Sequence, residues 1–246
     1  MTEFGCLGFG NLPSALFCGL FAKGALEPSQ LTVYDPSELA TERAVRMGCR
    51  VAPSLAALCA ECRTLVLAVK PVVFRALAEE LQSATKSYGR VLSVMAGVSM
   101  AEIQSATDKE TMRLIPTLAA AGGDDILAVC GADLADIKQM LRSIGTVMET
   151  TEENLPLITV AASCGLGFAA KVLAEYQEAV KRLGFSDEEA AQITGTTFRN
   201  AAQMAPYAPL ASKVATKGGV TEKGLSAMEA NGLGSLFDKA FNAAKH

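Results

Sequence analysis

The strongest constraint on the fold is a regular alternation of short apolar runs with segments of helical spacing over the first half of the chain. Five of these runs are rich in β-forming residues and are expected to be strands: Phe4 to Phe9, Leu31 to Asp35, Thr64 to Lys70, Val91 to Ala96 and Thr111 to Pro116. Because the runs are almost wholly apolar, both faces of their sheet should be covered. The alternation therefore predicts an α/β domain with a parallel sheet and helices on both sides.

Beyond about Glu149 the pattern becomes helical throughout. Residues 154–185 repeat apolar side chains at helical spacing, and Ser186 followed by an acidic turn predicts a capped second helix. The segment from Ala205 to Val220, with two prolines and a Gly-Gly pair, is expected to interrupt the helices before two short ones follow. The long apolar helix, from about Leu155 to Leu183, should bury its surface in a homodimer or a higher homo-oligomer. We place the domain boundary at residue 150, giving domains 1–150 and 151–246.

Charge and hydropathy limit the partners. The net charge is −4 and there is no basic run, so the electrostatic pattern of a nucleic-acid-binding protein is absent. No apolar stretch is expected to reach the roughly 20 residues that span a bilayer, and the N-terminus lacks the pattern of a signal peptide. The sequence predicts a cytoplasmic protein with a small-molecule partner and no membrane partner.

Cysteine and histidine usage limits the chemistry. Seven cysteines lie in apolar contexts and are expected to be reduced, packed thiols: Cys6, Cys18, Cys49, Cys59, Cys62, Cys130 and Cys164. Cys59 and Cys62 form a Cys-x-x-Cys pair, for which buried packing is preferred over a zinc or redox site. The one histidine is the terminal His246, so no metal site is expected, and Ser-His-Asp and Cys-His mechanisms are excluded.

A glycine-rich stretch, Gly8 to Leu16, follows the first predicted strand and opens a helix. Pro13 suits the first helical turn, because its missing N–H is not needed there. The free amides and the positive end of the helix dipole would then suit a pyrophosphate. The third glycine of the usual dinucleotide fingerprint is absent, with Pro13 in its place, so helix packing should be looser or differently arranged. The alternative is a tight turn with no ligand.

Asp35 ends the second predicted strand, where an acidic side chain accepts hydrogen bonds from adenosine ribose hydroxyls. The alternative is a cap or turn former before Pro36. Together with the glycine turn, Asp35 predicts dinucleotide binding. A carboxylate there would repel a 2′-phosphate, which favours NAD over NADP, although Arg43 could pair with such a phosphate.

Five stretches in order resemble the pyrroline-5-carboxylate reductase family: GFGNLPSAL from Gly8, LAVKP from Leu67, MAGVS from Met95, RLIP from Arg113 and TKGGVTEKGLSAME from Thr216. The likeness covers nearly the whole chain, and its Gly-Gly-x-Thr stretch is the most specific part. The resemblance implies a Rossmann domain at residues 1–150 and a helical substrate and dimerisation domain at 151–246. It also implies reduction of 1-pyrroline-5-carboxylate to proline by hydride transfer from NADH or NADPH.

The residues and the resemblance together give a set of cofactor contacts at strand ends: Gly8, Phe9, Gly10, Asn11, Leu12, Asp35, Ala68, Val69, Lys70, Pro71, Ala96 and Gly97. Pro71 should hold Lys70 extended at the sheet edge, facing the nicotinamide ribose or amide. We assign Lys70 a catalytic role, against the alternative of a lysine in water. Ser99 is expected to cap the following helix.

The substrate residues are expected at Thr216, Gly218, Gly219, Val220 and Thr221. The amides of Gly219, Val220 and Thr221 open a helix and would seat a carboxylate. By resemblance, the catalytic hydroxyl of Thr221 lies next to the imine, and Thr216 stands where the family has a substrate-contacting serine. The alternative is a plain capping turn. Catalysis would depend on positioning the imine carbon, without a strong acid or base.

Three segments depart from the family pattern. Its Ser-Gly-Ser-Gly-Pro-Ala-Tyr stretch aligns with residues 162–168, its Met-Pro-Asn becomes Ile115-Pro116-Thr117, and the loop between Met204 and Thr216 lacks an acidic residue. Two alternatives stay open. One is a reductase of another small imine or β-hydroxy acid, with Lys171 as proton donor. The other is a nucleotide-binding regulatory protein without turnover.

Overall fold

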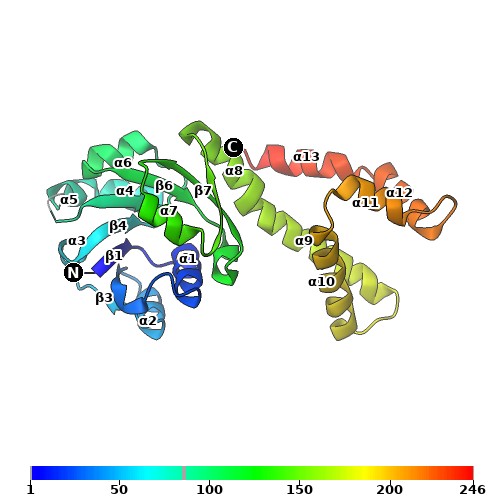
Figure 1. Ribbon diagram of the computed structural model, residues 1–246, viewed down its shortest axis with the longest axis horizontal. Coiled ribbons are helices and arrows are strands. Elements are labelled where there is room, and N and C mark those ends of the chain that lie inside the picture. Colours follow the sequence, from blue (N-terminus) through cyan, green and yellow to red (C-terminus); the bar gives the residue numbers. More distant parts are fainter. Residues whose placement is uncertain (1, 85–86, 246) are drawn as a thin grey trace. The chain divides into compact units, whose positions relative to one another are not determined.

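The computed structural model describes residues 2–84 and 87–245 (Figure 1). The chain divides into two compact units, Met1–Ser163 and Cys164–His246. The first unit contains one sheet in the order β3-β2-β1-β4-β5-β6-β7-β8. Its strands are β1 (Thr2–Leu7), β2 (Leu31–Tyr34), β3 (Arg50–Val51), β4 (Cys62–Leu67), β5 (Arg90–Ser93), β6 (Thr111–Ile115), β7 (Asp125–Gly131) and β8 (Gly145–Glu149). The predicted α/β class and parallel sheet are confirmed for β1 to β6.

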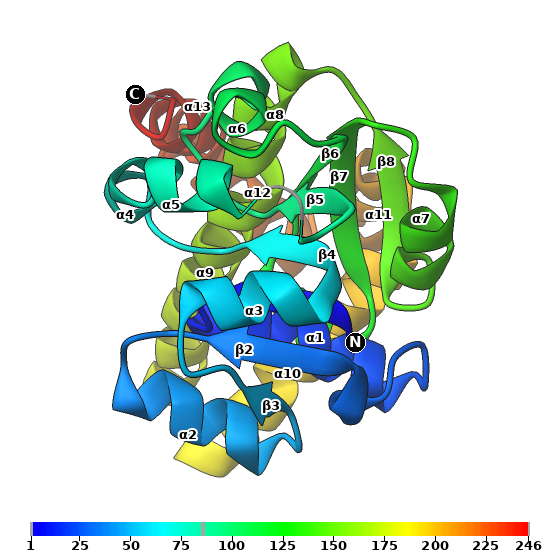
Figure 2. The same cartoon turned by 90° about the vertical axis from the view of Figure 1, so that its left-hand side faces the viewer.

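The sheet is not parallel throughout, and this corrects the expectation. β7 runs antiparallel to β6, because only a 3₁₀ turn at Leu118–Gly122 joins them, whereas a parallel neighbour needs a longer crossover. β8 then pairs in parallel with β7. The sequence analysis missed β3, β7 and β8, of which β3 is only two exposed residues long. Figure 2 shows β3 and β8 at opposite edges of the sheet, beside α2 and α7.

Two apolar clusters cover the two faces of the sheet. One face is packed by α1 (Asn11–Ala22), α2 (Glu38–Arg46) and α7 (Ala135–Leu141). The other face is packed by α3 (Leu55–Glu61), α4 (Pro71–Ala76), α5 (Ala78–Ser83) and α6 (Met100–Thr107). Burial on both sides explains why the central strands are continuous apolar runs.

The missing third glycine has a structural explanation. Pro13 is buried in the first turn of α1, and the close approach of this helix occurs at Gly19 instead. A Cβ on Gly19 would collide with the backbone carbonyl of Ala120. The helix is therefore packed tightly, but at a different point and against the turn before β7.

The second unit is helical, as expected. A continuous helical stretch begins at the end of the first unit with α8 (Leu155–Ile158) and a π-helix at Thr159–Cys164, and continues as α9 (Gly165–Arg182) in the second unit. It is followed by α10 (Asp187–Gln203), α11 (Tyr207–Val214), α12 (Val220–Ala230) and α13 (Leu233–Ala243). Ser186 caps α10 in a reciprocal capping box with Glu189, as expected. The segment expected to interrupt the helices contains α11, which begins directly after Pro206, where a proline does not block a helix.

One expectation about the long helix was wrong. Within the described residues, the helix Glu152–Arg182 is long and apolar enough to cross a membrane by length and composition. Its most apolar window of 18 residues has a mean hydropathy of 1.8, and only 6% of this window is buried. One such helix is weak evidence of a membrane span, because a helix that buries its apolar side against protein has the same composition. The finding leaves a large apolar surface on this helix to be covered.

Candidate functional site

The turn after β1 lies against the end of β4. Gly8 has a φ of +88°, and its N–H donates to the carbonyl of Tyr34 at 2.9 Å. A Cβ on Gly8 would lie 2.8 Å from the carbonyl oxygen of Ala68. The strand order reverses between β1 and β4, and in doubly wound sheets ligands bind outside the carboxyl ends of the strands at this point. The predicted cofactor loops therefore meet where such a ligand is expected.

Gly10 begins α1 without a side chain over the helix end. Gly10 is the N-cap residue and has no side chain that could hydrogen-bond to the N–H groups of the first turn. A Cβ on Gly10 would have no atom within 4 Å, so the space is open, and Asn11 is exposed beside it. The first N–H groups of a helix lack intrahelical partners and attract anions. Leu12 is half-buried below them.

Asp35 is bound to the glycine turn. Its Oδ2 accepts a hydrogen bond from the N–H of Phe9 at 2.7 Å, and its Oδ1 accepts one from the N–H of Ser37 at 2.8 Å. Asp35 therefore does act as a turn former around Pro36, which was the alternative to ribose binding. Each carboxylate oxygen keeps a free acceptor direction, so a ribose contact stays a prediction. Arg43 lies close by, with Nη1 3.5 Å from both the carbonyl of Phe9 and Oγ of Ser14.

The loop after β4 has the predicted backbone. Lys70 is extended, with φ −66° and ψ 148°, and Pro71 is the first residue of α4. Ala68 and Val69 are half-buried, whereas the Lys70 side chain is exposed. The exposure of Lys70 fits the alternative of a lysine in water. Its position at the carboxyl edge of the sheet fits the cofactor role, which stays a prediction.

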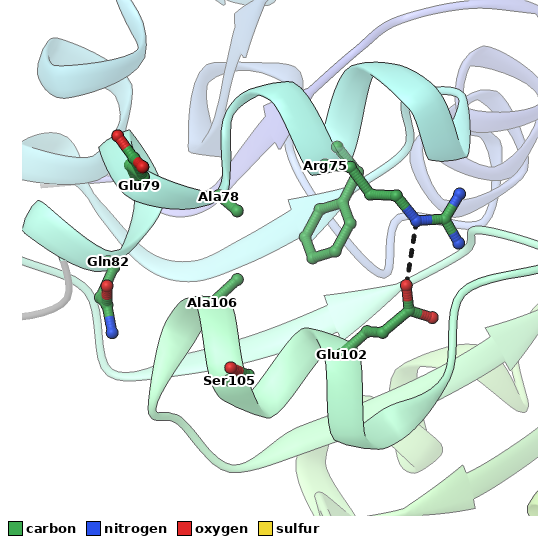
Figure 3. A pocket seen from close by; sticks show the side chains of 8 residues that line it. Arg75, Ala78, Glu79, Gln82, Glu102, Ser105 and Ala106 are labelled. Atoms are coloured by element: carbon green, nitrogen blue, oxygen red, sulfur yellow. Dashed lines mark hydrogen bonds and ion pairs between the residues drawn. The ribbon is translucent and has the colours of Figure 1, made fainter.

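The loop after β5 brings Ala96 and Gly97 to the same edge, both exposed, with Gly97 at a φ of +72°. Ser99 caps α6 in a capping box with Glu102, as expected. Arg75 of α4 donates from Nη2 to the carbonyl of Gly97 at 3.3 Å and from Nε to Glu102 at 3.0 Å. Figure 3 shows this ion pair at the rim of a pocket of about 320 Å³ between α4, α5 and α6.

Sequence reasoning missed a second arginine at this edge. Arg113 of β6 is buried, and its Nη2 donates to the carbonyl of Met95 at 3.3 Å. Its Nη1 donates at 2.7 Å to Glu152, whose same oxygen accepts the N–H of Met100 at 2.6 Å. The available signal was a charged residue inside an apolar strand.

In the second unit, the glycine loop before α12 forms as predicted but with fewer free amides. Gly218 has a φ of +75°, and the N–H of Gly219 donates to the carbonyl of Thr216 at 2.8 Å. The expectation that Gly219 offers its amide to a carboxylate is therefore corrected. Val220 and Thr221 are the first helical residues, whose N–H groups have no partner within an α-helix.

Thr216 and Glu222 shape this loop. Thr216 is exposed, and a Cβ on Gly219 would collide with its hydroxyl, so this position requires a glycine. Oε2 of Glu222 accepts the N–H of Gly218 at 2.7 Å. A side-chain carboxylate thus already binds one amide of the loop, next to the two amides left open.

The altered segments have structural roles. Thr117 is buried, and its N–H and hydroxyl donate to the buried Asp125 at 2.7 and 2.8 Å. It therefore organises the turn before β7. Phe168, which replaces the family tyrosine, packs edge-on against Phe241 at a centroid distance of 5.7 Å. Lys171 is exposed and pairs with Glu175 one helical turn away.

The cysteines, all within the described residues, form no disulfide, and most of them are buried. Cys6, Cys49, Cys59, Cys62 and Cys130 are buried as expected, but Cys18 is exposed. Burial raises the pKa of the Cys59 and Cys62 thiols to about 12. Among the residues the structure describes, no group of three or more His, Cys, Asp or Glu side chains is placed to hold a metal ion. His246 lies outside the described residues.

Two family models match the chain. Residues 152–246 match pyrroline-5-carboxylate reductase dimerisation, and residues 3–97 match NADP oxidoreductase coenzyme F420-dependent. Among curated relatives, the pyrroline-5-carboxylate reductase of Pseudomonas aeruginosa is 28% identical, over 97% of this chain and 92% of the relative. That of Staphylococcus saprophyticus is 25% identical, over 96% and 93%.

Solved structures agree on the fold. Pyrroline carboxylate reductase of Plasmodium falciparum with NADP bound superposes with a TM-score of 0.89 at 21% identity, covering 99% of this chain and 95% of that one. Pyrroline-5-carboxylate reductase of Coxiella burnetii superposes with a TM-score of 0.82 at 24% identity, covering 99% and 96%. The Rossmann-type first unit and the helical second unit are thus the fold of these proteins.

Proposed function

Because the chain belongs to the pyrroline-5-carboxylate reductase family, we propose that it reduces 1-pyrroline-5-carboxylate to proline with NADH or NADPH. The structural observation that carries this proposal is the contact between the turn at Gly8 and the carbonyl of Ala68, at the point where the strand order reverses. This contact brings two cofactor loops together at the carboxyl edge of the sheet.

The residues at this edge fit a dinucleotide. Gly10 leaves open space over the start of α1, which suits a pyrophosphate. Around it the proposed contacts are Gly8, Phe9, Asn11 and Leu12, with Asp35 for the ribose, and Ala68, Val69, Lys70, Pro71, Ala96 and Gly97 for the nicotinamide end. When bound, the reduced nicotinamide supplies the hydride. The chain itself binds and orients the two reactants.

The substrate is held by the loop before α12. The N–H groups of Val220 and Thr221 bind the substrate carboxylate, and the hydroxyl of Thr221 hydrogen-bonds to the ring nitrogen, accepting from its N–H when the imine is protonated. Gly218, Gly219 and Thr216 give the loop its shape. A cyclic imine is already electrophilic when protonated, so fixing its carboxylate and its C=N bond is the main contribution of the protein.

Three finer features complete the proposal. NAD is preferred over NADP, because the Asp35 carboxylate lies beside the turn where a 2′-phosphate would approach. The chain forms a homodimer through its helical part, which matches the dimerisation model. The protein acts in the cytoplasm on a small imino acid and binds neither nucleic acid nor a membrane.

A steady-state assay tests this function. The purified protein is mixed with 1-pyrroline-5-carboxylate and either NADH or NADPH, while absorbance of the reduced nicotinamide and formation of proline are followed. We expect oxidation that requires the imine and yields equal amounts of proline. Oxidation only with another imine or with a β-keto acid would favour the alternative reductases. Dinucleotide binding without turnover of any of these substrates would favour a regulatory protein.

A further inference from the structure

We propose that Arg113 and Glu152 are positioning residues that hold the loop between β5 and α6 in the shape required for dinucleotide binding. This inference rests on the proposed function, because it takes Ala96 and Gly97 of that loop as cofactor contacts. Neither residue touches the cofactor in this account. They act through the backbone of the loop.

Arg113 is placed on the correct side of the sheet. Side chains alternate along a strand, and its neighbours Met112 and Leu114 point into the core cluster that contains α1. Arg113 therefore points to the opposite side, where its Nη2 donates to the carbonyl of Met95, two residues after β5 ends. From the middle of β6, its guanidinium fixes the first residue of the MAGVS loop.

Glu152 fixes the other end of the same loop. A single oxygen of Glu152, Oε1, accepts two hydrogen bonds, one from Nη1 of Arg113 at 2.7 Å and one from the N–H of Met100 at 2.6 Å. Met100 is the first residue of α6. The pair thus connects Met95 to Met100 through one arginine and one carboxylate, with the two exposed residues Ala96 and Gly97 between these fixed points.

A role limited to stability does not account well for this pair. The Arg113 side chain is only 8% exposed, and its Nε has no hydrogen-bond partner among the described residues. A buried arginine that is not fully paired costs desolvation energy. The bonds that Arg113 does form hold the loop.

Arg75 provides an internal comparison. It also binds the loop, at the carbonyl of Gly97, but its side chain is 53% exposed, against 8% for Arg113, whereas the partners Glu102 and Glu152 are both 41% exposed. Exposed pairs of this kind contribute little. The buried arginine is therefore the one expected to determine the loop conformation.

Glu152→Ala and Glu152→Gln separate geometry from charge. Glutamine can retain the accepting oxygen for Arg113 and Met100, whereas alanine removes it. Arg90→Met is the matched control, because Arg90 is also a largely buried arginine, paired with Asp136, but at the start of β5 and away from the loop.

The experiment measures the dissociation constants of NADH and NADPH for the full-length protein by nicotinamide fluorescence, alongside the melting temperature of each variant. We expect Glu152→Ala and Arg113→Met to weaken binding about tenfold, the change given by loss of one charged hydrogen bond. We expect Glu152→Gln to stay within about twofold of the wild type. Arg90→Met should lower the melting temperature with unchanged binding.

Unchanged dinucleotide binding in both Glu152→Ala and Arg113→Met would overturn the inference. Equal weakening by Glu152→Gln and Glu152→Ala would also overturn it, since the accepting oxygen would then not be the cause. If the wild-type protein binds neither dinucleotide, the proposed function fails as well. A wild type that binds, beside variants that bind equally well, rejects the positioning role alone.

Discussion

The backbone N–H of Phe9 donates a 2.7 Å hydrogen bond to Oδ2 of Asp35, which joins the turn after β1 to the end of β2. One carboxylate therefore has two tasks, since it fixes the glycine turn and lies where a ribose is expected.

Asp35→Asn should shift cofactor choice toward NADPH. The substitution removes a negative charge but keeps an oxygen that can accept the N–H of Phe9. We expect the ratio of kcat/KM for NADPH to that for NADH to rise about fivefold, which corresponds to removing about 1 kcal/mol of repulsion near water. Arg43→Ala should move the ratio in the opposite direction. A ratio that stays constant in both variants contradicts the proposed NAD preference.

Gly10→Ala should separate ligand binding from folding. Gly10 has an ordinary φ of −72° and open space around its Cβ position, so the free protein should lose less than about 1 kcal/mol of stability. A bound pyrophosphate would meet the new methyl group, and dinucleotide affinity should fall about tenfold or more. Calorimetric titration and thermal melting measure the two effects.

Gly8→Ala is the companion variant. It combines a φ of +88° with a Cβ only 2.8 Å from the Ala68 carbonyl, so it should destabilise the fold by about 1–3 kcal/mol. Equal effects of the Gly8 and Gly10 substitutions on folding, with full dinucleotide affinity in Gly10→Ala, would argue against a phosphate site at this turn.

Thr221→Val should impair the substrate half alone. The side chain keeps its shape but loses the hydroxyl that hydrogen-bonds to the ring nitrogen, so kcat/KM for the imine should fall about tenfold or more. Thr221→Ser should retain most activity, and dinucleotide affinity should be unchanged in both. Wild-type kinetics in Thr221→Val would remove Thr221 from the catalytic role.

The apolar surface of the long helix predicts a dimer. Leu166 is an exposed large apolar residue of α9 within the matched dimerisation region. Leu166→Glu should shift the protein toward a monomer in sedimentation measurements, because an unpaired charge would be buried in the interface. Leu39→Glu, at an exposed position on α2, is the control and should leave the mass unchanged. A monomeric wild type would contradict this account.

Burial of the Cys-x-x-Cys thiols predicts an alkaline limit of stability. The pKa values of Cys59 and Cys62 are raised to about 12, whereas unfolded thiols ionise near the ordinary value of 9.0. Between these values the unfolded state loses protons first, so the free energy of unfolding should fall as pH rises from about 9 to about 12. Urea unfolding of the wild type and of Cys59→Ala should show a shallower pH dependence in the variant.

Much of the first unit could be predicted from sequence, because its central strands are apolar on both sides and each is followed by turn and capping residues. Ser99 illustrates this, and Ser186 does the same in the second unit, since local hydrogen bonds alone define their caps. The π-helix at Thr159–Cys164 and the antiparallel β7 have no comparable local signal. They depend on tertiary packing and on the length of a connection.

The candidate site also combines features that the sequence indicates with features that it does not. The glycine turns at Gly8 and Gly218 follow from composition, because only glycine readily adopts their positive φ angles. Two other features depend on contacts in the folded chain. One is the hydrogen bond from the Gly219 amide to Thr216. The other is the bridge from Arg113 through Glu152 to Met100. No spacing rule in the sequence indicates them.

The most direct test is a crystal structure of the protein with a nicotinamide dinucleotide and proline. The account predicts a diphosphate over the amides at the start of α1, beside Gly10, and the proline carboxylate on the N–H groups of Val220 and Thr221. Diphosphate and carboxylate bound elsewhere, with both helix starts occupied by protein side chains, would contradict it.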